Sequence, residues 1–208
     1  MKTAQVWRLL AAASALGAML SPAAAHHPMG GKMPVTFMEG LLSGLGHPVI
    51  GPDHLAFILA IGIASAVLPA GIGLIGAFIA ASTAGVLIHV AAVNVPMVET
   101  LVAGSVIVAG ALVALGQRAN GGVWLVVGVL AGLVHGYAFG EAVVGAQSAV
   151  IGAYLVGLAL VATAMAVAAM AATRALVAKA PRRDAYLRTA GVVLGCVGVA
   201  ILATGLVA

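Results

Sequence analysis

The feature that most constrains this chain is a series of apolar runs, each long enough to cross a lipid bilayer as one helix. A membrane-spanning helix needs about 20 predominantly apolar residues. We expect such helices at roughly 47–68, 71–93, 97–117, 122–142, 147–174 and 187–207, separated by Gly, Pro, Asn and charged residues. The sequence therefore predicts an all-α, polytopic membrane protein with about six transmembrane helices.

The composition excludes the main soluble classes. Hydrophobic residues make up 63% of the chain and charged residues only 7%, against about 25% charged residues in an ordinary soluble domain. Intrinsic disorder is excluded as well, because it requires low hydrophobicity and high net charge. The net charge of +4 comes from only nine Lys and Arg, so we expect no nucleic-acid partner. Cys196 is the single cysteine, which excludes an intramolecular disulfide and a thiolate metal cluster.

The N-terminus has the pattern of a secretory signal. Lys2 and Arg8 precede an apolar stretch at 9–20 that is too short to span a bilayer, and three alanines ending at Ala25 form an A-x-A-like cleavage site. We expect residues 1–25 to be a cleaved signal peptide. Residues 26–208 would then form a single transmembrane permease domain, with 26–46 as a short lead-in. The alternative is an uncleaved anchor helix.

The distribution of Lys and Arg predicts the orientation. A cleaved signal leaves the mature N-terminus outside the cytoplasmic membrane of a bacterium-like cell, so the loops after the first, third and fifth spans are cytoplasmic. Basic residues concentrate in cytoplasmic loops. Those loops hold Arg118, Arg174, Lys179, Arg182, Arg183 and Arg188, whereas the outer side holds Lys32. The signal and the charge bias therefore indicate the same multi-pass topology in the bacterial inner membrane.

Few ionisable residues remain in or near the spans, and an intramembrane one is a functional hypothesis by default. With the orientation above, they all fall in the outer half of the bilayer. They are His47, Asp53, His54, His89, Glu99, His135 and Glu141. Scattered polar core residues would not share one depth, which indicates a common site.

The first candidate group is the segment His47-Pro48-Val49-Ile50-Gly51-Pro52-Asp53-His54. On a regular helix, positions seven apart are separated by about 10.5 Å along the axis, too far for both His to bind one ion. Pro52 kinks a helix and, with Gly51, would bring His47 back toward Asp53 and His54. Imidazole and carboxylate together suit a divalent metal such as Ni(II), Co(II), Zn(II) or Cu(II). The alternative is an interfacial His47 and a capping role for Asp53.

The second candidate group is His135 and Glu141, again a His six residues before an acid with Gly between them. Taken alone, His135 could equally be a metal ligand or a core histidine held by a hydrogen bond. His89 is a weaker candidate, because a single His near a helix end is more often interfacial. His26 and His27 are also weaker candidates, as an N-terminal capture site that would exist only after cleavage.

The remaining motifs are structural or absent. Gly128, Gly132, Gly136 and Gly140 recur every four residues and predict a small-residue packing face on the fourth span. The chain contains no H-E-x-x-H, P-loop or G-x-S-x-G pattern. We therefore expect no enzyme activity and no prosthetic cofactor.

At its two His segments the chain resembles the HupE/UreJ family of nickel and cobalt permeases. The resemblance rests on His47-Pro48, Gly51 and Asp53-His54 in the first span and on His135-Gly136, Ala138, Gly140 and Glu141 in the fourth. It implies nickel or cobalt uptake for the assembly of hydrogenase, urease or cobalamin. Two departures stand out: Phe139 occupies a position where the family usually has a second His, and Ile58 one where it usually has Met.

Together these features predict a permease for a divalent transition metal, with Ni²⁺ or Co²⁺ as substrate and a His/Asp/Glu site in the outer half of the bundle. The expected partners are the metal ion, the lipid bilayer and cytosolic metal-handling proteins. Two alternatives stay open: a membrane-embedded accessory protein or metal chaperone for hydrogenase or urease assembly, and a proton-coupled transporter of another solute.

Overall fold

The computed structural model describes residues 32–116, 119–179 and 183–207. This part of the chain is helical and contains no strand. Its elements are α2 (Phe37–Ile50), α3 (Pro52–Val67), α4 (Gly71–Val90), α5 (Val98–Leu115), α6 (Gly121–Gly140), the 3-10 turn η2 (Glu141–Val143), α7 (Ser148–Lys179) and α8 (Arg183–Val207). The predicted signal peptide at 1–25 lies outside the described residues, and so do His26 and His27.

Most of these helices have the length and composition of membrane spans. Five of them, α4 to α8, are long and apolar enough to cross a bilayer, and α2 with α3 adds a sixth if this bent pair is one broken span. The prediction of a polytopic, all-α membrane protein with about six spans is confirmed. Apolar side chains such as Leu130 and Leu160 are about 60% exposed on the outer surface of the bundle, where a bilayer would cover them.

The first span differs from the prediction. It was expected at 47–68 after an irregular lead-in, but the chain is helical from Phe37. A capping box begins this helix: Glu39 donates its backbone N–H to the Thr36 hydroxyl, and the Glu39 carboxylate accepts the Thr36 backbone N–H. The predicted break at Gly51-Pro52 is confirmed, because α2 and α3 meet there at 78°.

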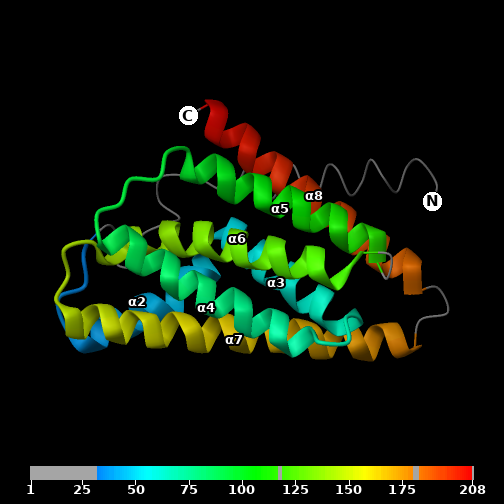
Figure 1. The fold of residues 1–208 in the computed structure, drawn as a ribbon, viewed down its shortest axis with the longest axis horizontal. Coiled ribbons are helices and arrows are strands. Elements are labelled where there is room, and N and C mark those ends of the chain that lie inside the picture. Colours follow the sequence, from blue (N-terminus) through cyan, green and yellow to red (C-terminus); the bar gives the residue numbers. More distant parts are fainter. Residues whose placement is uncertain (1–31, 117–118, 180–182, 208) are drawn as a thin grey trace.

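The short helix α3 lies at the centre of the bundle and contacts all the other helices (Figure 1). Its buried residues Phe57 and Ile61 belong to the main apolar core. The core is completed by residues of the five long helices, among them Phe78, Val106, Trp124, Ala166 and Leu194. The N-terminus of α3 is therefore held inside protein on every side, and this positions the polar residues that begin it.

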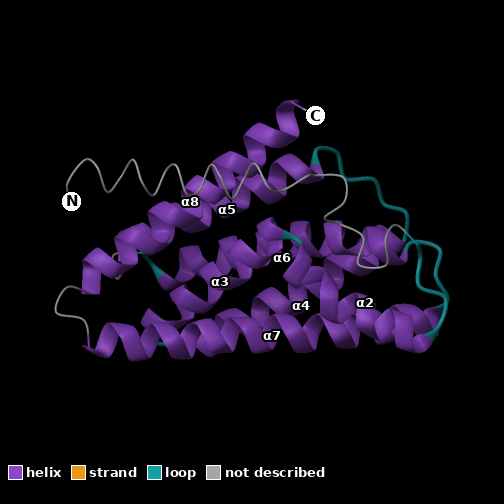
Figure 2. Cartoon of the chain, turned by 180° about the vertical axis from the view of Figure 1, so that it is seen from behind, coloured by secondary structure: helices purple, strands orange, loops and turns teal. Residues whose placement is uncertain are grey.

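The long helices pack in close pairs, α4 with α6 and α5 with α8, while α2 lies along α7. The α5–α8 pair runs obliquely across the rest of the bundle in both views (Figures 1 and 2). The predicted glycine face of α6 is confirmed: a Cβ at Gly136 would collide with the carbonyl oxygen of Ser82 on α4, and one at Gly132 would meet Phe78 O at 2.9 Å. These glycines let α4 approach α6 at backbone distance.

Candidate metal site

The break between α2 and α3 brings together the three polar residues of the first predicted group. Gly51 is extended (φ −76°, ψ 110°) and caps α3, with Pro52 as its first residue. The ring centroids of His47 and His54 are 5.7 Å apart, well within the separation that an unbroken helix would impose. Asp53 Oδ1 accepts the backbone N–H of His54 at 2.8 Å within the first turn of α3. The N-cap residue is Gly51 and α3 has no side-chain N-cap hydrogen bond, so the capping role that the alternative interpretation gave to Asp53 is not seen.

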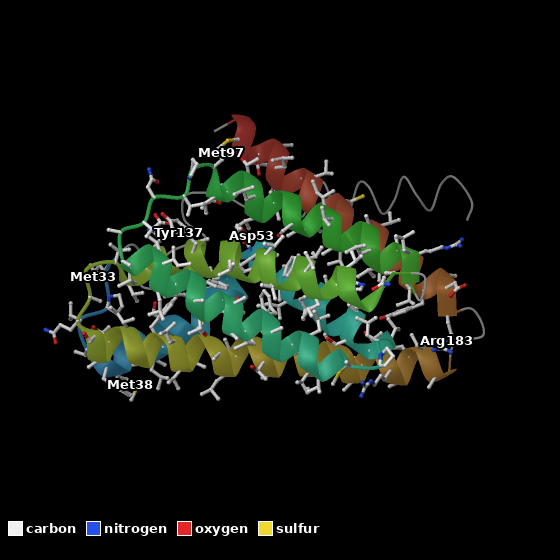
Figure 3. All side chains as sticks on the ribbon, in the orientation of Figure 1. Met33, Met38, Asp53, Met97, Tyr137 and Arg183 are labelled. Atoms are coloured by element: carbon white, nitrogen blue, oxygen red, sulfur yellow. The ribbon has the colours of Figure 1, made fainter. Side chains whose placement is uncertain are left out.

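His135 joins this group from α6. Its Nδ1 lies 2.8 Å from Nδ1 of His54, a hydrogen bond that links residues 81 positions apart. We call His47, Asp53, His54 and His135 the histidine cluster. All four are buried, with exposed fractions of 2% or less. Labelled Asp53 lies between the end of the bundle that holds Met33 and the end that holds Arg183 (Figure 3).

A hydrogen-bond chain fixes the protons on His135 and His54. The Ser105 hydroxyl on α5 donates to the carbonyl of Val102 at 2.7 Å, so its oxygen accepts from Nε2 of His135 at 2.8 Å. Neutral imidazole carries one N–H. Nδ1 of His135 is therefore an acceptor, and Nδ1 of His54 donates to it. Neutral His54 then presents Nε2 as its electron-pair donor, 4.0 Å from Asp53 Oδ1.

A second chain of hydrogen bonds fixes the proton on His47. The Tyr154 hydroxyl on α7 donates to the carbonyl of Phe139 at 2.7 Å. Its oxygen consequently accepts the proton on Nδ1 of His47, which lies 2.7 Å away. Neutral His47 also presents Nε2 as its electron-pair donor. Both histidines of the first predicted group thus have the tautomer in which Nε2 can bind a metal ion.

An aromatic ring occupies the space beside these two imidazoles. The Phe139 ring centroid lies 4.0 Å from that of His54 and 5.1 Å from that of His47. Phe57 packs against His135, with ring centroids 4.7 Å apart. The cluster is therefore shielded by apolar rings, which lowers the local dielectric constant and strengthens electrostatic interactions inside it.

The other predicted ligands lie apart from the cluster. Glu141 begins η2 and is exposed. His89, half-buried at the end of α4, donates from Nδ1 to the backbone carbonyl of Tyr137 at 2.6 Å and stacks on the ring of Tyr137 at 4.0 Å. Glu99, which was not among the predicted ligands, is exposed in the first turn of α5. Within the described ranges, no three His, Cys, Asp or Glu side chains are already placed to hold one metal ion.

Two residues of the site were missed by sequence reasoning. Tyr154 and Ser105 were not predicted as parts of it, yet they orient the imidazoles of His47 and His135. Each is an isolated polar residue within an apolar span, and that isolation was the available signal. The partner of each could not be read from the sequence, because His47 and Tyr154 are 107 positions apart.

Comparison with known proteins gives two matches. The family model described as HupE / UreJ protein matches residues 14–201, most of the chain. A curated relative, Protein HupE of Rhizobium leguminosarum bv. viciae, is 31% identical over 127 residues, which are 60% of this chain and 64% of the relative. The chain thus matches just under two thirds of that relative's length. No solved structure matches the chain.

Proposed function

Because this chain belongs to the HupE / UreJ family, we propose that it carries a divalent transition-metal ion, nickel or cobalt, across the bacterial cytoplasmic membrane. Family membership supports a role in nickel or cobalt transport or in an accessory step of metal handling. In our proposal residues 26–208 form one permease domain, the mature N-terminus is outside, and cytosolic metal-handling proteins receive the ion. The accessory or metal-chaperone role is the second candidate, which binds the metal without moving it.

The observation that carries the proposal is the pair of hydrogen-bond chains that end at Val102 and Phe139. They leave Nε2 of both His47 and His54 as electron-pair donors within one buried cluster, beside the Asp53 carboxylate. Two imidazoles and a carboxylate are the donor types that Ni(II) and Co(II) accept. Metal-binding histidines characteristically donate their other N–H to a supporting group, and Tyr154 and His135 supply that support here.

The ion would be the substrate of this site, so it must bind reversibly. Since no three candidate ligands among the described residues are already placed around one point, the proposal includes a rotation of the His47 and Asp53 side chains toward a shared ion. His135 enters the proposal as the residue that orients His54. Glu141 and His89 would act nearer the outer end, before the ion reaches the cluster, and His26 and His27 would capture it first.

The membrane potential supplies a driving force for this transport. It is worth about 2.3 kcal/mol per charge per 100 mV. At 100 mV a dication therefore gains roughly 4.6 kcal/mol, which corresponds to more than a thousandfold accumulation inside the cell. Asp53 offsets part of the ion's charge while it is inside the bundle. ATP hydrolysis by this chain is therefore not needed for uptake.

The test is radioactive nickel and cobalt uptake by proteoliposomes that contain only this protein. Removing one member of a buried charge pair costs about 3–5 kcal/mol. We therefore expect Asp53→Asn to weaken metal binding by a hundredfold or more, and His54→Ala to have a similar effect. The matched control is Asp184→Asn, because Asp184 is exposed in the first turn of α8.

Each outcome separates the candidates. Potential-driven uptake that is lost in Asp53→Asn and kept in Asp184→Asn supports the permease. Binding at the cluster without uptake supports the chaperone role. Normal uptake by well-expressed Asp53→Asn and His54→Ala would show that the histidine cluster is structural.

A further inference from the structure

A cavity of about 280 Å³ lies at the end of the bundle opposite Met33, where Arg183 is labelled in Figure 3. It is formed where α3 ends, near the end of α7 and at the start of α8. Its lining residues are Ala66, Val67, Arg174, Val177, Ala178 and Arg183. The lining therefore contains two arginines and four apolar residues.

The charge of this cavity is uncompensated within the described part of the chain. Neither Arg174 nor Arg183 forms an ion pair with a described carboxylate, and no acidic residue lines the cavity. Asp184, next to Arg183 in the sequence, is exposed and is not among the lining residues. An anion bound between the two arginines would be attracted to both of them.

Among the described residues, α7 and α8 make few contacts with each other beside this cavity, whereas α8 packs extensively on α5 and α7 on α2 and α3. The ends of membrane-spanning helices lie at the level of the lipid headgroups, so this opening faces headgroups. A molecule bound here would contact α3, α7 and α8 together.

We propose that this cavity binds a phosphate group, supplied by an anionic phospholipid of the surrounding leaflet. The planar guanidinium of arginine matches the geometry of phosphate and binds it through two parallel hydrogen bonds. Basic cavities between transmembrane helices at the membrane surface are suited to such headgroups. The apolar residues Val67 and Val177 would lie against the glycerol and the first methylenes of the lipid. This site is separate from the histidine cluster and does not depend on the proposed transport function.

The test uses native mass spectrometry of the purified full-length protein with phosphatidylglycerol or phosphatidylcholine of identical acyl chains. We expect a preference for phosphatidylglycerol. Each basic residue at an anionic membrane surface contributes enough for about a fivefold change in affinity. Arg174→Gln and Arg183→Gln should therefore each reduce that preference about fivefold, and Arg174→Lys should retain part of it.

The matched control is Arg188→Gln, which removes one charge from the same helix outside the cavity lining. It should leave the preference unchanged.

A second arm adds inorganic phosphate, with chloride at equal ionic strength as its control. Phosphate that displaces phosphatidylglycerol from the wild-type protein, but not chloride, supports a phosphate site; phosphate that binds while neither lipid does identifies a soluble anion as the source. An equal loss of lipid preference in Arg188→Gln, or no loss of it in Arg174→Gln and Arg183→Gln, would overturn the proposal. These arginines would then serve only to set the orientation of the protein in the membrane.

Discussion

At the scale of single residues, two backbone carbonyls determine the chemistry of the histidine cluster. A carbonyl can only accept, so Val102 and Phe139 fix the direction of every hydrogen bond that follows them. Ser105 transmits this constraint to His135 and then to His54, and Tyr154 transmits it to His47. Groups outside the predicted ligand set thus decide which ring nitrogen of each histidine carries the proton.

Tyr154 gives a direct test of this constraint. Tyr154→Phe removes the hydroxyl that orients His47, and loss of such a supporting group typically costs 10–100-fold in metal affinity. We expect nickel binding to weaken by about tenfold or more at unchanged protein yield. Isothermal titration calorimetry of the purified protein measures the effect.

The matched control for this change is Tyr186→Phe on α8, which removes a tyrosine hydroxyl away from the histidine cluster. It should bind nickel as the wild type does. If both variants bind as the wild type, the orientation of His47 does not control affinity. Equal losses in both would point to a general effect of removing a hydroxyl from the bundle.

Sequence reasoning predicted the residues of the histidine cluster better than the residues that orient them. His47, Asp53 and His54 were found because ionisable groups are rare in an apolar span and because Gly51-Pro52 separates them. The proximity of His54 and His135 was indicated only by the common depth in the bilayer that was predicted for them, and the hydrogen bond between them was not predicted. Tyr154 and Ser105 could not be paired with their histidines, because helix packing decides which faces meet and the sequence pattern does not specify it.

At the scale of the elements, the break at Gly51 is the feature that makes the cluster. Gly51 has backbone angles that any residue can adopt, so its small size matters more than its flexibility. A Cβ there would lie 2.6 Å from Cδ2 of His54 and 3.1 Å from Oδ1 of Asp53. The first contact is closer than real Cβ atoms come to their neighbours, so one of the two side chains would have to move.

We therefore expect Gly51→Ala to weaken nickel binding by about tenfold while the protein stays folded. The matched control is Gly73→Ala on α4, where a new Cβ would meet nothing within 4 Å and where Ala favours the helix. Binding by calorimetry and thermal unfolding of both variants are the measurements. Unchanged binding in Gly51→Ala would show that the position of His54 does not control metal affinity, contrary to the proposed role of His54.

Apolar run length predicted the long helices and failed at the short ones. The starts of α4 to α7 lie within a residue or so of the expected positions, and α8 begins four residues earlier than expected. The failure is α2, which contains Ser43 and Glu39 and so escapes a search for continuous apolar sequence. The pattern Thr36-Phe37-Met38-Glu39 is a capping-box signature, and it was the local signal that could have placed the start of this helix.

At the scale of the whole molecule, the described arginines lie at one end of the bundle and most of the remaining ionisable residues lie toward the other. Arg174, Arg183 and Arg188 lie near the junction of α7 and α8 together with Asp184, whereas His89, Glu99 and Glu141 lie at the opposite ends of their helices, the end that also holds Lys32. This separation follows from the alternating direction of successive spans. It matches an ion that enters at the acidic and histidine-rich end and leaves past the basic end.

The orientation of this axis in the cell remains a prediction from the basic loops, and cysteine labelling in intact cells tests it. In a Cys196→Ala background, Asn94→Cys places a thiol in the exposed loop between α4 and α5, and Ala185→Cys places one beside Arg183 at the opposite end. A membrane-impermeant maleimide should label Asn94→Cys in intact cells, and it should label Ala185→Cys only after the cells are permeabilised. The reverse pattern would put the basic end outside, so that an inside-negative potential would drive a dication from the basic end toward the histidine cluster. Uptake would then have to pass the arginines first, and the proposed entry site would be the exit.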